Sequence, residues 1–482
     1  MVRRLRREWS EMAEEPQYDL VCIGSGPAGQ RGAVQAAKLG KRVAVIERQR
    51  VFGGVCVDLG TIPSKSIREA VITHTGLGQR FGPRQPGDFS ASLARLNITA
   101  DAIMHDVQDI VQREAAVVEN QLRRNRIEVL HGEASFVDPH TLDVHSEAGV
   151  RRVRGENILI AVGTRPAHPD GVEIDEETVL TSDGVMRMRT LPRSLVIVGG
   201  GVIGIEYASI FAALGIEVTL VDRRTRPLEF LDWEIVGELI HQMRNANVTF
   251  RLNESVERVE LSEGPPRRGV VHLASGKRLV ADVVLFSIGR VGATRAINLP
   301  AAGLESDERG RLSVDEGFRT SVSHIFAAGD VIGFPSLAST SSEQGRLAVC
   351  TAFGVPHKPM SRNFPVGIYS IPEISMVGQP EHELTDEKIP YETGIARYRE
   401  IARGQILGDD TGMLKLIVHR DTRQLLGVHA IGTGATELIH IGQAVLRLGG
   451  GLDYLLNTVF NYPTLAECYK VAALDAHNKL TL

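Results

Sequence analysis

Two segments of the chain share one pattern: a short apolar strand, a glycine-rich turn, an amphipathic helix and a second apolar strand. The first is YDLVCIGSGPAGQRGAVQAAKLGKRVAVIE, residues 18–47, and the second is SLVIVGGGVIGIEYASIFAALGIEVTLVDRR, residues 194–224. The second strand ends in Glu47 in the first segment and in Asp222 in the second. This order predicts two βαβ units with parallel strands.

Both turns have the spacing GxGxxG that is typical of dinucleotide-binding βαβ units. In the first turn Gly24 permits the tight bend, Gly26 lets a pyrophosphate approach the backbone, and Gly29 lets the helix pack on the strand. Glu47 is placed to accept hydrogen bonds from a ribose. The corresponding residues of the second turn are Gly199, Gly201, Gly204 and Asp222. We expect two dinucleotides, one resident and one that comes and goes; a glycine turn without a ligand is the alternative.

A third motif, TSVSHIFAAGDVIG, is an apolar strand that ends in Gly329 and Asp330. A carboxylate beside a glycine at a strand end can hydrogen-bond a sugar hydroxyl with little hindrance, as flavin binding requires. The alternative to a flavin-binding role is that this aspartate only caps a turn. Two more apolar strands, residues 158–166 and 283–292, contain Gly163 and Gly289 near their ends. They indicate crossings between domains, and both glycines are candidate cofactor-binding residues.

From about residue 359 the pattern changes to strand-like runs, MLKLIVH and LLGVHAIG, followed by a closing helix pattern that begins at ATELIHIGQAVLRL. This region therefore reads as an α+β module. Residues 101–125 repeat apolar positions at helical spacing, and their charges fit a solvated face. Together the patterns predict an α/β protein with two Rossmann-like domains and a C-terminal α+β domain.

Composition limits the classes of partner and the compartment. The 482 residues allow about three domains. The net charge is −5 with both signs interspersed, so we expect small-molecule partners rather than nucleic acid or membrane. MVRRLRR is followed by EWSEMAEEPQ rather than by an apolar signal core, and residues 1–16 read as a mobile lead-in. Four scattered cysteines give no disulfide framework or metal-ligand spacing, which favours the cytoplasm.

The stretch GGVCVDLGTIPSK, residues 53–65, resembles half of a redox-disulfide site. With GSGPAG, GGGVIGIE, IFAAGD, YSIPEISMVG and YPTLAE, it follows the order of the two-dinucleotide flavoprotein disulfide reductases, which the chain resembles over about residues 17–475. The resemblance implies FAD on the first turn, a nicotinamide dinucleotide on the second, and a homodimer or higher homo-oligomer. The domains it implies are FAD-binding at 17–168, NAD(P)-binding at 169–290, FAD-binding and central at 291–358, and interface at 359–482.

Two departures from that family stand out. Thr61 replaces the second cysteine, and a threonine hydroxyl can neither form a disulfide nor supply a thiolate. Tyr462 replaces a histidine, and a tyrosine with a pKa of about 10 is a poor proton carrier for thiols. The set GxCxxxGTIPSK, FNYPTxAE, SLASTSSEQGR and ARGQILG is similar to the soluble, Si-specific NAD(P)+ transhydrogenases.

This second resemblance implies the reaction NADPH + NAD+ ⇌ NADP+ + NADH, with NAD(H) and NADP(H) as substrates and ping-pong transfer through flavin N5. By motif match Lys65 lies near N5 and pairs with Glu206 to stabilise the reduced flavin, whereas the alternative is a surface ion pair. Cys56 is expected to be a packed thiol, and Thr61 to lie against the flavin or hydrogen-bond locally. The sequence leaves the direction of transfer open.

Dual specificity is also implied by DRR at the end of the second segment. Asp222 suits a ribose 2′-hydroxyl, while Arg223 and Arg224 could pair with a 2′-phosphate. A strict NAD enzyme with a solvated arginine pair fits as well. Two other functions remain open: an NAD(P)H diaphorase or quinone reductase, and a non-catalytic FAD-binding redox sensor.

Overall fold

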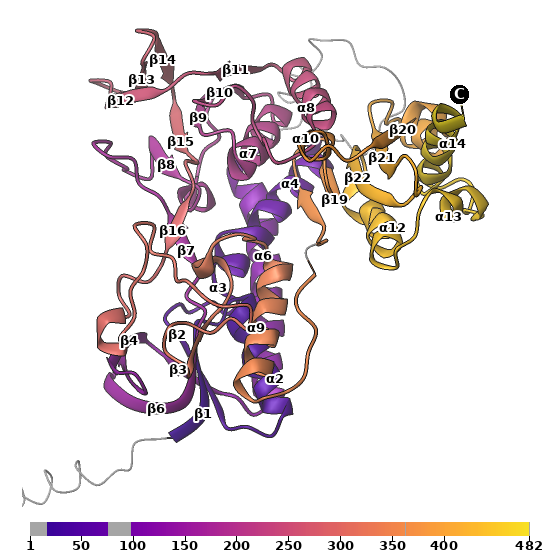
Figure 1. The fold of residues 1–482 in the computed structure, drawn as a ribbon. Coiled ribbons are helices and arrows are strands. Elements are labelled where there is room, and N and C mark those ends of the chain that lie inside the picture. Colours follow the sequence, from indigo (N-terminus) through magenta and orange to yellow (C-terminus); the bar gives the residue numbers. More distant parts are fainter. Residues whose placement is uncertain (1–16, 76–97, 362, 482) are drawn as a thin grey trace, which may run out of the picture. The chain divides into compact units, whose positions relative to one another are not determined.

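The computed structural model describes residues 17–75, 98–361 and 363–481, so the lead-in predicted at residues 1–16 lies outside the described part (Figure 1). The chain divides into two compact units, each assembled from separate stretches of sequence. Of the described residues, the first unit comprises 17–63, 108–165 and 290–360, and the second comprises 64–75, 98–107, 166–289, 361 and 363–481. Helices α4 (Thr61–Thr75) and α6 (Ala100–Arg124) contribute residues to both units.

The first unit is built on one sheet in the order β3-β2-β1-β6-β5-β4, with β17 also paired to β6. Strands β1, β2, β3, β6 and β17 run parallel, while β4 and β5 form antiparallel pairs. The bounds are β1 Gln17–Ile23, β2 Val43–Glu47, β3 Glu128–His131, β4 Glu133–Asp138, β5 Thr141–Ser146, β6 Gly149–Ile160 and β17 Ile325–Ala327. Because strand β1 is apolar on both sides, both faces of the sheet can be covered.

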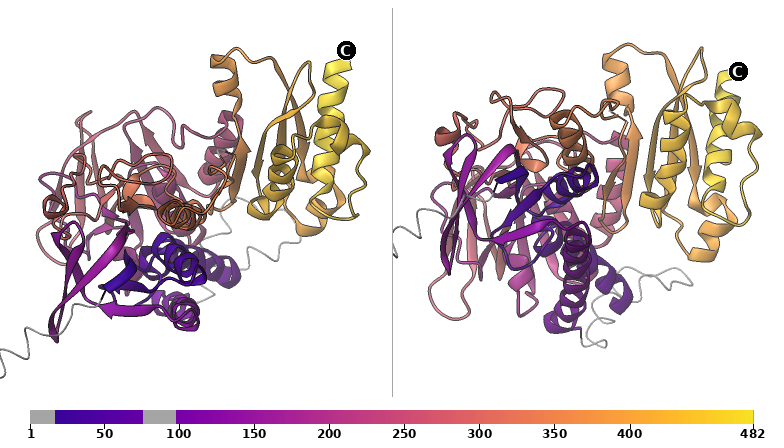
Figure 2. Two further views of the ribbon diagram at one scale, coloured as in Figure 1. Left: turned by 60° about the horizontal axis from the view of Figure 1, so that its bottom comes forward. Right: turned by 90° about the horizontal axis from the view of Figure 1, so that it is seen from below.

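Two buried clusters cover the two faces of this sheet. Val21 and Ile23 of β1 belong to one cluster, and Leu20 and Cys22 belong to the other, as the period of two in a strand requires. On the second face lie α2 (Pro27–Lys38) and α9 (Ala338–Ala352), which run side by side in Figure 2. They can approach closely because a Cβ at Gly345 would lie only 2.0 Å from the carbonyl oxygen of Ala28. The remaining short elements are α3 Gly54–Asp58, β16 Arg290–Gly292, η2 Leu299–Ala302 and η3 Asp330–Ile332.

The second unit contains a second parallel sheet, in the order β11-β10-β9-β15-β8. Its strands are β8 Val179–Thr181, β9 Ser194–Val198, β10 Glu217–Asp222, β11 Val248–Leu252 and β15 Val283–Phe286. Helices α7 (Val202–Ala213) and α8 (Trp233–Asn245) belong to this fold, and η1 is Gly184–Arg187. A small antiparallel sheet follows from β12 Val256–Leu261, β13 Gly269–Leu273 and β14 Arg278–Ala281. Short strand β7 (Thr164–Pro166) lies at the boundary of the two units and pairs with β16.

The C-terminal part of the second unit is an antiparallel sheet in the order β18-β19-β22-β21-β20. The strands are β18 Val366–Ile368, β19 Ile374–Gly378, β20 Tyr391–Arg397, β21 Met413–His419 and β22 Leu425–Ile431. The helices are α10 Glu381–Asp386, η4 Tyr398–Glu400, α11 Ala402–Leu407, α12 Ala435–Arg447, α13 Leu452–Asn457 and α14 Glu467–Thr481. Figure 1 shows α12 and α14, in yellow, beside this sheet, whose buried residues share one cluster with theirs.

The predicted α/β class is confirmed, with one mainly parallel sheet, one parallel sheet and an α+β C-terminal part. The closing helix pattern predicted from ATELIHIGQAVLRL begins with α12 and continues in α13 and α14, two helices that the sequence did not distinguish. The buried face of α14 consists mainly of small side chains, such as Ala472 and Ala476, so its apolar stripe is weak in the sequence. Among the helices of the described ranges, none has both the length and the apolar character needed to cross a membrane.

Candidate functional site

The first glycine turn has the geometry that its sequence predicts. Gly24 lies at φ +105°, and a Cβ there would be 2.5 Å from the carbonyl oxygen of Ala161 at the end of β6. A Cβ on Gly29 would be 1.9 Å from the carbonyl oxygen of Gly24. The helix can therefore lie this close to the strand only because position 29 is a glycine. At Gly26, by contrast, a Cβ would meet only a carbonyl oxygen at 3.9 Å. The turn is therefore closed on the protein side and open where a pyrophosphate would approach the start of α2.

Glu47, at the end of β2, is buried and turned toward this glycine turn. Its Oε2 accepts hydrogen bonds from the Ser25 backbone N (2.8 Å) and from Ser25 Oγ (2.7 Å), and its Oε1 accepts one from Gln49 N (2.8 Å). An ionised carboxylate has about four acceptor positions. Within the described chain, three of the four acceptor positions of Glu47 are therefore occupied. One position on Oε1 remains that a ribose hydroxyl could fill. Ser25 is a site residue that the sequence reading missed, although it is the variable residue between the first two glycines.

The backbone geometry of the second turn closely matches that of the first. Gly199 lies at φ +110°, with a hypothetical Cβ 2.5 Å from the carbonyl oxygen of Ser287 at the end of β15. A Cβ on Gly204 would lie 1.9 Å from the carbonyl oxygen of Gly199, and one on Gly201 would meet nothing within 4 Å. In each sheet the turn lies between the two strands at which the strand order reverses, where open α/β sheets bind dinucleotides.

Asp222 differs from Glu47 in what surrounds it. Its Oδ1 accepts hydrogen bonds from Arg224 N (2.8 Å) and Arg224 Nε (2.9 Å), and its Oδ2 accepts from Arg224 Nη2 (2.7 Å) and from the backbone N of Gly200. Burial alone would raise the pKa of Asp222, but the hydrogen bonds and the charge of Arg224 outweigh it and lower that pKa. Arg223 is exposed. The two arginines of the DRR motif therefore have different surroundings.

Asp330 follows Gly329, which lies at φ +84° and donates its N–H to Gln344 Oε1 at 2.9 Å. The Thr164 hydroxyl donates weakly to Asp330 Oδ2 at 3.4 Å, and Arg290 Nε donates to Thr164 Oγ1 at 2.9 Å. Burial raises the pKa of Asp330, with Arg290 and hydroxyl hydrogen bonds acting in the opposite direction. Gln344 and Arg290 were missed from the sequence, although Arg290 directly follows Gly289.

Lys65 and Glu206 form the ion pair that the motif match predicted. Lys65 Nζ lies 2.9 Å from Glu206 Oε1 and 2.8 Å from Oε2, and the Glu206 side chain is only 6% exposed. The Glu206 carboxylate also accepts the backbone N–H of Tyr369 at 2.9 Å, and Lys65 Nζ lies 5.1 Å from the centre of the Tyr369 ring. The pair is too buried to be the alternative surface ion pair. Tyr369 is a further neighbour that the sequence reading did not assign.

The other candidate residues lie outside these contacts. Thr61 is exposed at the start of α4, and Cys56 is a half-buried thiol in α3. Gly163 lies at φ +64° and Gly289 at φ +110°, and a Cβ on either would meet no atom within 4 Å among the described residues. Tyr462 is 67% exposed. Their roles at a bound cofactor stay predictions.

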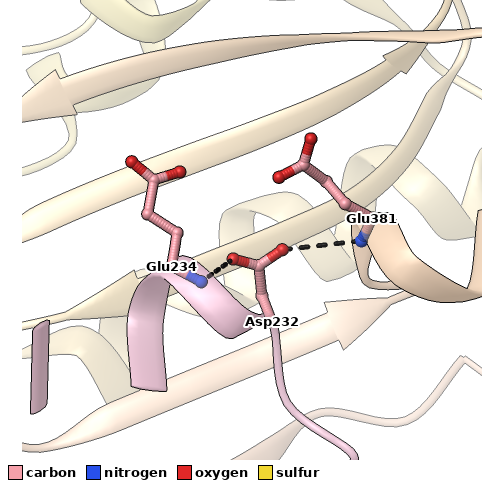
Figure 3. Close-up of side chains that lie close together, drawn as sticks. All are labelled: Asp232, Glu234 and Glu381. Carbon is pink, nitrogen blue, oxygen red and sulfur yellow. Dashed lines mark hydrogen bonds between the residues drawn. The ribbon is translucent and has the colours of Figure 1, made fainter. Parts of the chain in front are cut away.

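A separate cluster in the second unit brings together three carboxylates, from Asp232, Glu234 and Glu381 (Figure 3), whose oxygens lie within 4.8 Å of one another. Lys415 of β21 is fully buried and donates from Nζ to Asp232 (3.0 and 3.1 Å), to Glu234 (3.0 Å) and to Glu381. Burial lowers the pKa of Lys415, but the surrounding carboxylates outweigh burial and raise it. The carboxylates of this cluster therefore share an internal cation.

Comparison with known proteins defines the family. Residues 18–345 match the family described as pyridine nucleotide-disulphide oxidoreductase, and residues 364–473 match the dimerisation domain of the same family. The chain therefore belongs to the pyridine nucleotide-disulphide oxidoreductase family. It is 52% identical over 468 residues to a soluble pyridine nucleotide transhydrogenase of Mycobacterium bovis, covering 96% of this chain and 98% of the relative. It is 42% identical to the protein of the same name from Colwellia psychrerythraea, covering 97% and 100%.

Solved structures agree with this assignment. The HOCl-induced flavoprotein disulfide reductase RclA from Escherichia coli superposes with a TM-score of 0.83 at 28% identity, covering 95% of this chain and 99% of that chain. LpdA from Mycobacterium tuberculosis superposes with a TM-score of 0.86 at 25% identity and the same coverage. The family that the motifs indicated is thus confirmed, and so is the group of transhydrogenase relatives that the departures at Thr61 and Tyr462 indicated.

Proposed function

We propose that this chain is a FAD-dependent NAD(P)+ transhydrogenase that catalyses NADPH + NAD+ ⇌ NADP+ + NADH. The observation that carries the proposal is that one chain holds two copies of the same glycine turn, with a threonine at position 61 where a redox disulfide would need a cysteine. Two dinucleotide sites without a dithiol fit an enzyme whose donor and acceptor are both nicotinamides. The names of the relatives support the same reaction.

FAD fits the first turn. The Gly24 and Gly29 positions leave no space for a side chain, Gly26 is open, and Glu47 keeps one acceptor position for a ribose. In this proposal Asp330, Thr61 and Gly163 contribute to the same cofactor. When bound, FAD supplies a ring that can accept a hydride from one nicotinamide and return it to another.

For the second turn we propose that Gly199, Gly201 and Gly204 bind the pyrophosphate of NAD(H) and NADP(H) in turn, with Asp222, Arg223, Arg224 and Gly289 around the nucleotide. A single site used twice requires ping-pong kinetics, since the first product must leave before the second substrate enters. We assign Lys65 the role of a cation beside the flavin ring. Its charge is held by the buried Glu206 carboxylate, and a fixed cation stabilises negative charge on a neighbouring ring.

We also propose a cytoplasmic homodimer. The match to the family's dimerisation domain supports the dimer, and the four cysteines, which form no disulfide among the described residues, fit a reducing compartment. The proposed domains are those expected from the sequence, namely 17–168 and 291–358 for FAD, 169–290 for the nicotinamide nucleotide and 359–482 for the interface.

The decisive experiment mixes purified, FAD-loaded protein with NADPH and thio-NAD+ and records thio-NADH. Formation of thio-NADH with parallel-line ping-pong kinetics is the expected result. If thio-NADH does not form while a quinone is reduced rapidly, the protein is a diaphorase instead. If neither nucleotide bleaches the flavin absorbance under anaerobic conditions, the protein is a non-catalytic flavoprotein.

The role of Lys65 is tested by Lys65→Met, with Lys277→Met as the control because Lys277 forms an exposed ion pair with Glu254 in the same unit. Lys65→Met is expected to slow flavin reduction by about 100-fold, which is about 2.7 kcal/mol of barrier. A stopped-flow rate within twofold of the control would reject the assignment. Cys56→Ser is expected to keep hydride transfer within about tenfold, or about 1.4 kcal/mol, because no thiol chemistry is needed.

A further inference from the structure

The second turn contains a carboxylate that has no acceptor position to spare. Asp222 receives four hydrogen bonds, from Gly200 N and from three nitrogens of Arg224. An ionised carboxylate offers about four acceptor positions. A ribose hydroxyl can therefore hydrogen-bond to Asp222 only after one of these donors leaves.

Two of the four donors belong to the Arg224 side chain and two to the backbone. The N–H groups of Gly200 and Arg224 are fixed by the turn and by the end of β10. Among the described residues the guanidinium donates to Asp222, through Nε at 2.9 Å and Nη2 at 2.7 Å, while Glu229 acts on it by its charge alone, and the Arg224 side chain is 34% exposed. The side chain is thus the donor that can move away, and its departure would free one position on each carboxylate oxygen.

We propose that Arg224 selects between the two dinucleotides: its guanidinium competes with the adenosine ribose of NAD(H) for Asp222 and, once displaced, pairs with the 2′-phosphate of NADP(H). The inference rests on the proposed function, which assigns both dinucleotides to this turn. It adds that one arginine weakens the binding of one substrate and strengthens the binding of the other.

The neighbouring arginines do not share this position. Arg223 is exposed and makes no contact with Asp222 among the described residues, and Arg226 stacks on Trp233 with its guanidinium 4.1 Å from the ring centre. Hydrogen bonding to Asp222 raises the pKa of Arg224, and an arginine stays protonated in proteins without such a partner, so the side chain remains a cation in both positions. A permanently charged, planar guanidinium suits both a carboxylate and a phosphate, since each accepts two parallel hydrogen bonds from it.

The first turn supplies the variant that tests this idea. The residue two positions after Glu47 is Gln49, which donates its backbone N–H to the acid as Arg224 does but brings no charge. Arg224→Gln therefore gives the second turn the same residue type that the first turn has two positions after its acid. Arg226→Gln is the matched control, because it removes the same charge two positions further on, from a guanidinium that lies over the Trp233 ring rather than on Asp222.

The experiment measures the equilibrium binding of NAD+, NADP+, 5′-AMP and 2′,5′-ADP to FAD-loaded protein by calorimetry, so that hydride transfer is not required. Arg224→Gln is expected to bind NAD+ and 5′-AMP about three- to tenfold more tightly and NADP+ and 2′,5′-ADP at least about tenfold more weakly. Arg226→Gln is expected to leave the binding of NAD+ and 5′-AMP unchanged. Arg224→Lys, whose single ammonium can occupy only one of the two positions, is expected to give intermediate affinities.

The inference is overturned if Arg224→Gln, with normal FAD content, binds NAD+ no more tightly than the unaltered protein. It is also overturned if Arg226→Gln strengthens NAD+ binding equally, since the effect would then be one of net charge. Failure of the unaltered protein to bind either nucleotide would overturn the proposed function itself. If Arg224→Gln does not retain FAD, the binding measurements on Arg224→Lys take its place. An NAD+ affinity of Arg224→Lys equal to that of the unaltered protein then overturns the inference.

Discussion

The two glycine turns differ little in backbone and much in charge. In both, the first glycine has φ near +105° to +110°, and in both a Cβ on the third glycine would lie 1.9 Å from the first glycine's carbonyl oxygen. In both, the acid at the strand end accepts the N–H of the residue two positions on, Gln49 or Arg224. Only the second acid is also held by a guanidinium. Under the proposed function the backbone defines where a dinucleotide can lie, and we expect the Arg224 side chain to influence how strongly each dinucleotide is held.

The largest expected effect comes from breaking both turns in the same way, with Gly29→Val and Gly204→Val. Each valine would place Cβ against a carbonyl oxygen and force the helix from the strand, at a cost of about 3 kcal/mol or more. We expect Gly29→Val to lose bound FAD and its absorbance. Gly204→Val is expected to keep FAD but to lose reduction by NADPH.

Gly237→Ala is the control for this pair, since Gly237 lies in α8 and a Cβ there would meet nothing within 4 Å. It is expected to keep both FAD and reduction by NADPH, with a melting temperature equal to or above that of the unaltered protein. Loss of FAD in Gly204→Val, or retention in Gly29→Val, would show that the two turns are not assigned as proposed.

A smaller effect should distinguish Asp222 from Asp330, whose pKa values shift in opposite directions. The lowered pKa of Asp222 means that its ionised form stabilises the folded chain above the unfolded pKa of about 3.9, and that this stability is lost as pH falls through the folded value. The raised pKa of Asp330 means the reverse: stability is gained as pH falls from above the folded value toward about 3.9.

Denaturation of FAD-free protein between about pH 2 and pH 8 covers both effects, since the contribution of Asp222 is lost only below about pH 3.9. At pH 7 we expect Asp222→Asn to lower the free energy of unfolding by about 1–2 kcal/mol, because charge-assisted hydrogen bonds are lost. Asp330→Asn is expected to leave it unchanged or raised, because an ionised group is no longer buried. Destabilisation of similar size by both variants would contradict the opposite shifts.

The smallest expected effect is that of Gln49→Arg, which brings the side chain of the second turn into the first. An arginine at this position could fill the acceptor position that Glu47 keeps, and it should weaken FAD binding by about two- to fivefold, or about 0.4–1 kcal/mol. FAD fluorescence during reconstitution measures the affinity. Arg48→Gln, a change at the adjacent exposed position, is the control. If it changes FAD affinity as much as Gln49→Arg does, the proposed difference between the two turns is rejected.

The strands and helices next to the turns were predictable because local pattern and tertiary burial agree there. MLKLIVH and LLGVHAIG, for example, became β21 and β22, and residues 101–125 became most of α6. α14 was not distinguished as a separate helix, since alanine gives a weak apolar signal. Lys65 and Glu206 were paired only through the family motif, as 141 positions of sequence separate them.

The sequence by itself determined the two dinucleotide turns, the acids that follow them and the missing dithiol, because these depend on glycine conformation and residue chemistry at short spacing. Only the tertiary structure decided how those acids are occupied. Ser25 and Gln49 satisfy three positions of Glu47, and Gly200 and Arg224 satisfy all four of Asp222. Hydrogen-bond capacity is a property of the assembled surroundings, so DRR read as a string could suggest two equivalent arginines where the folded chain has one paired with the acid and one exposed.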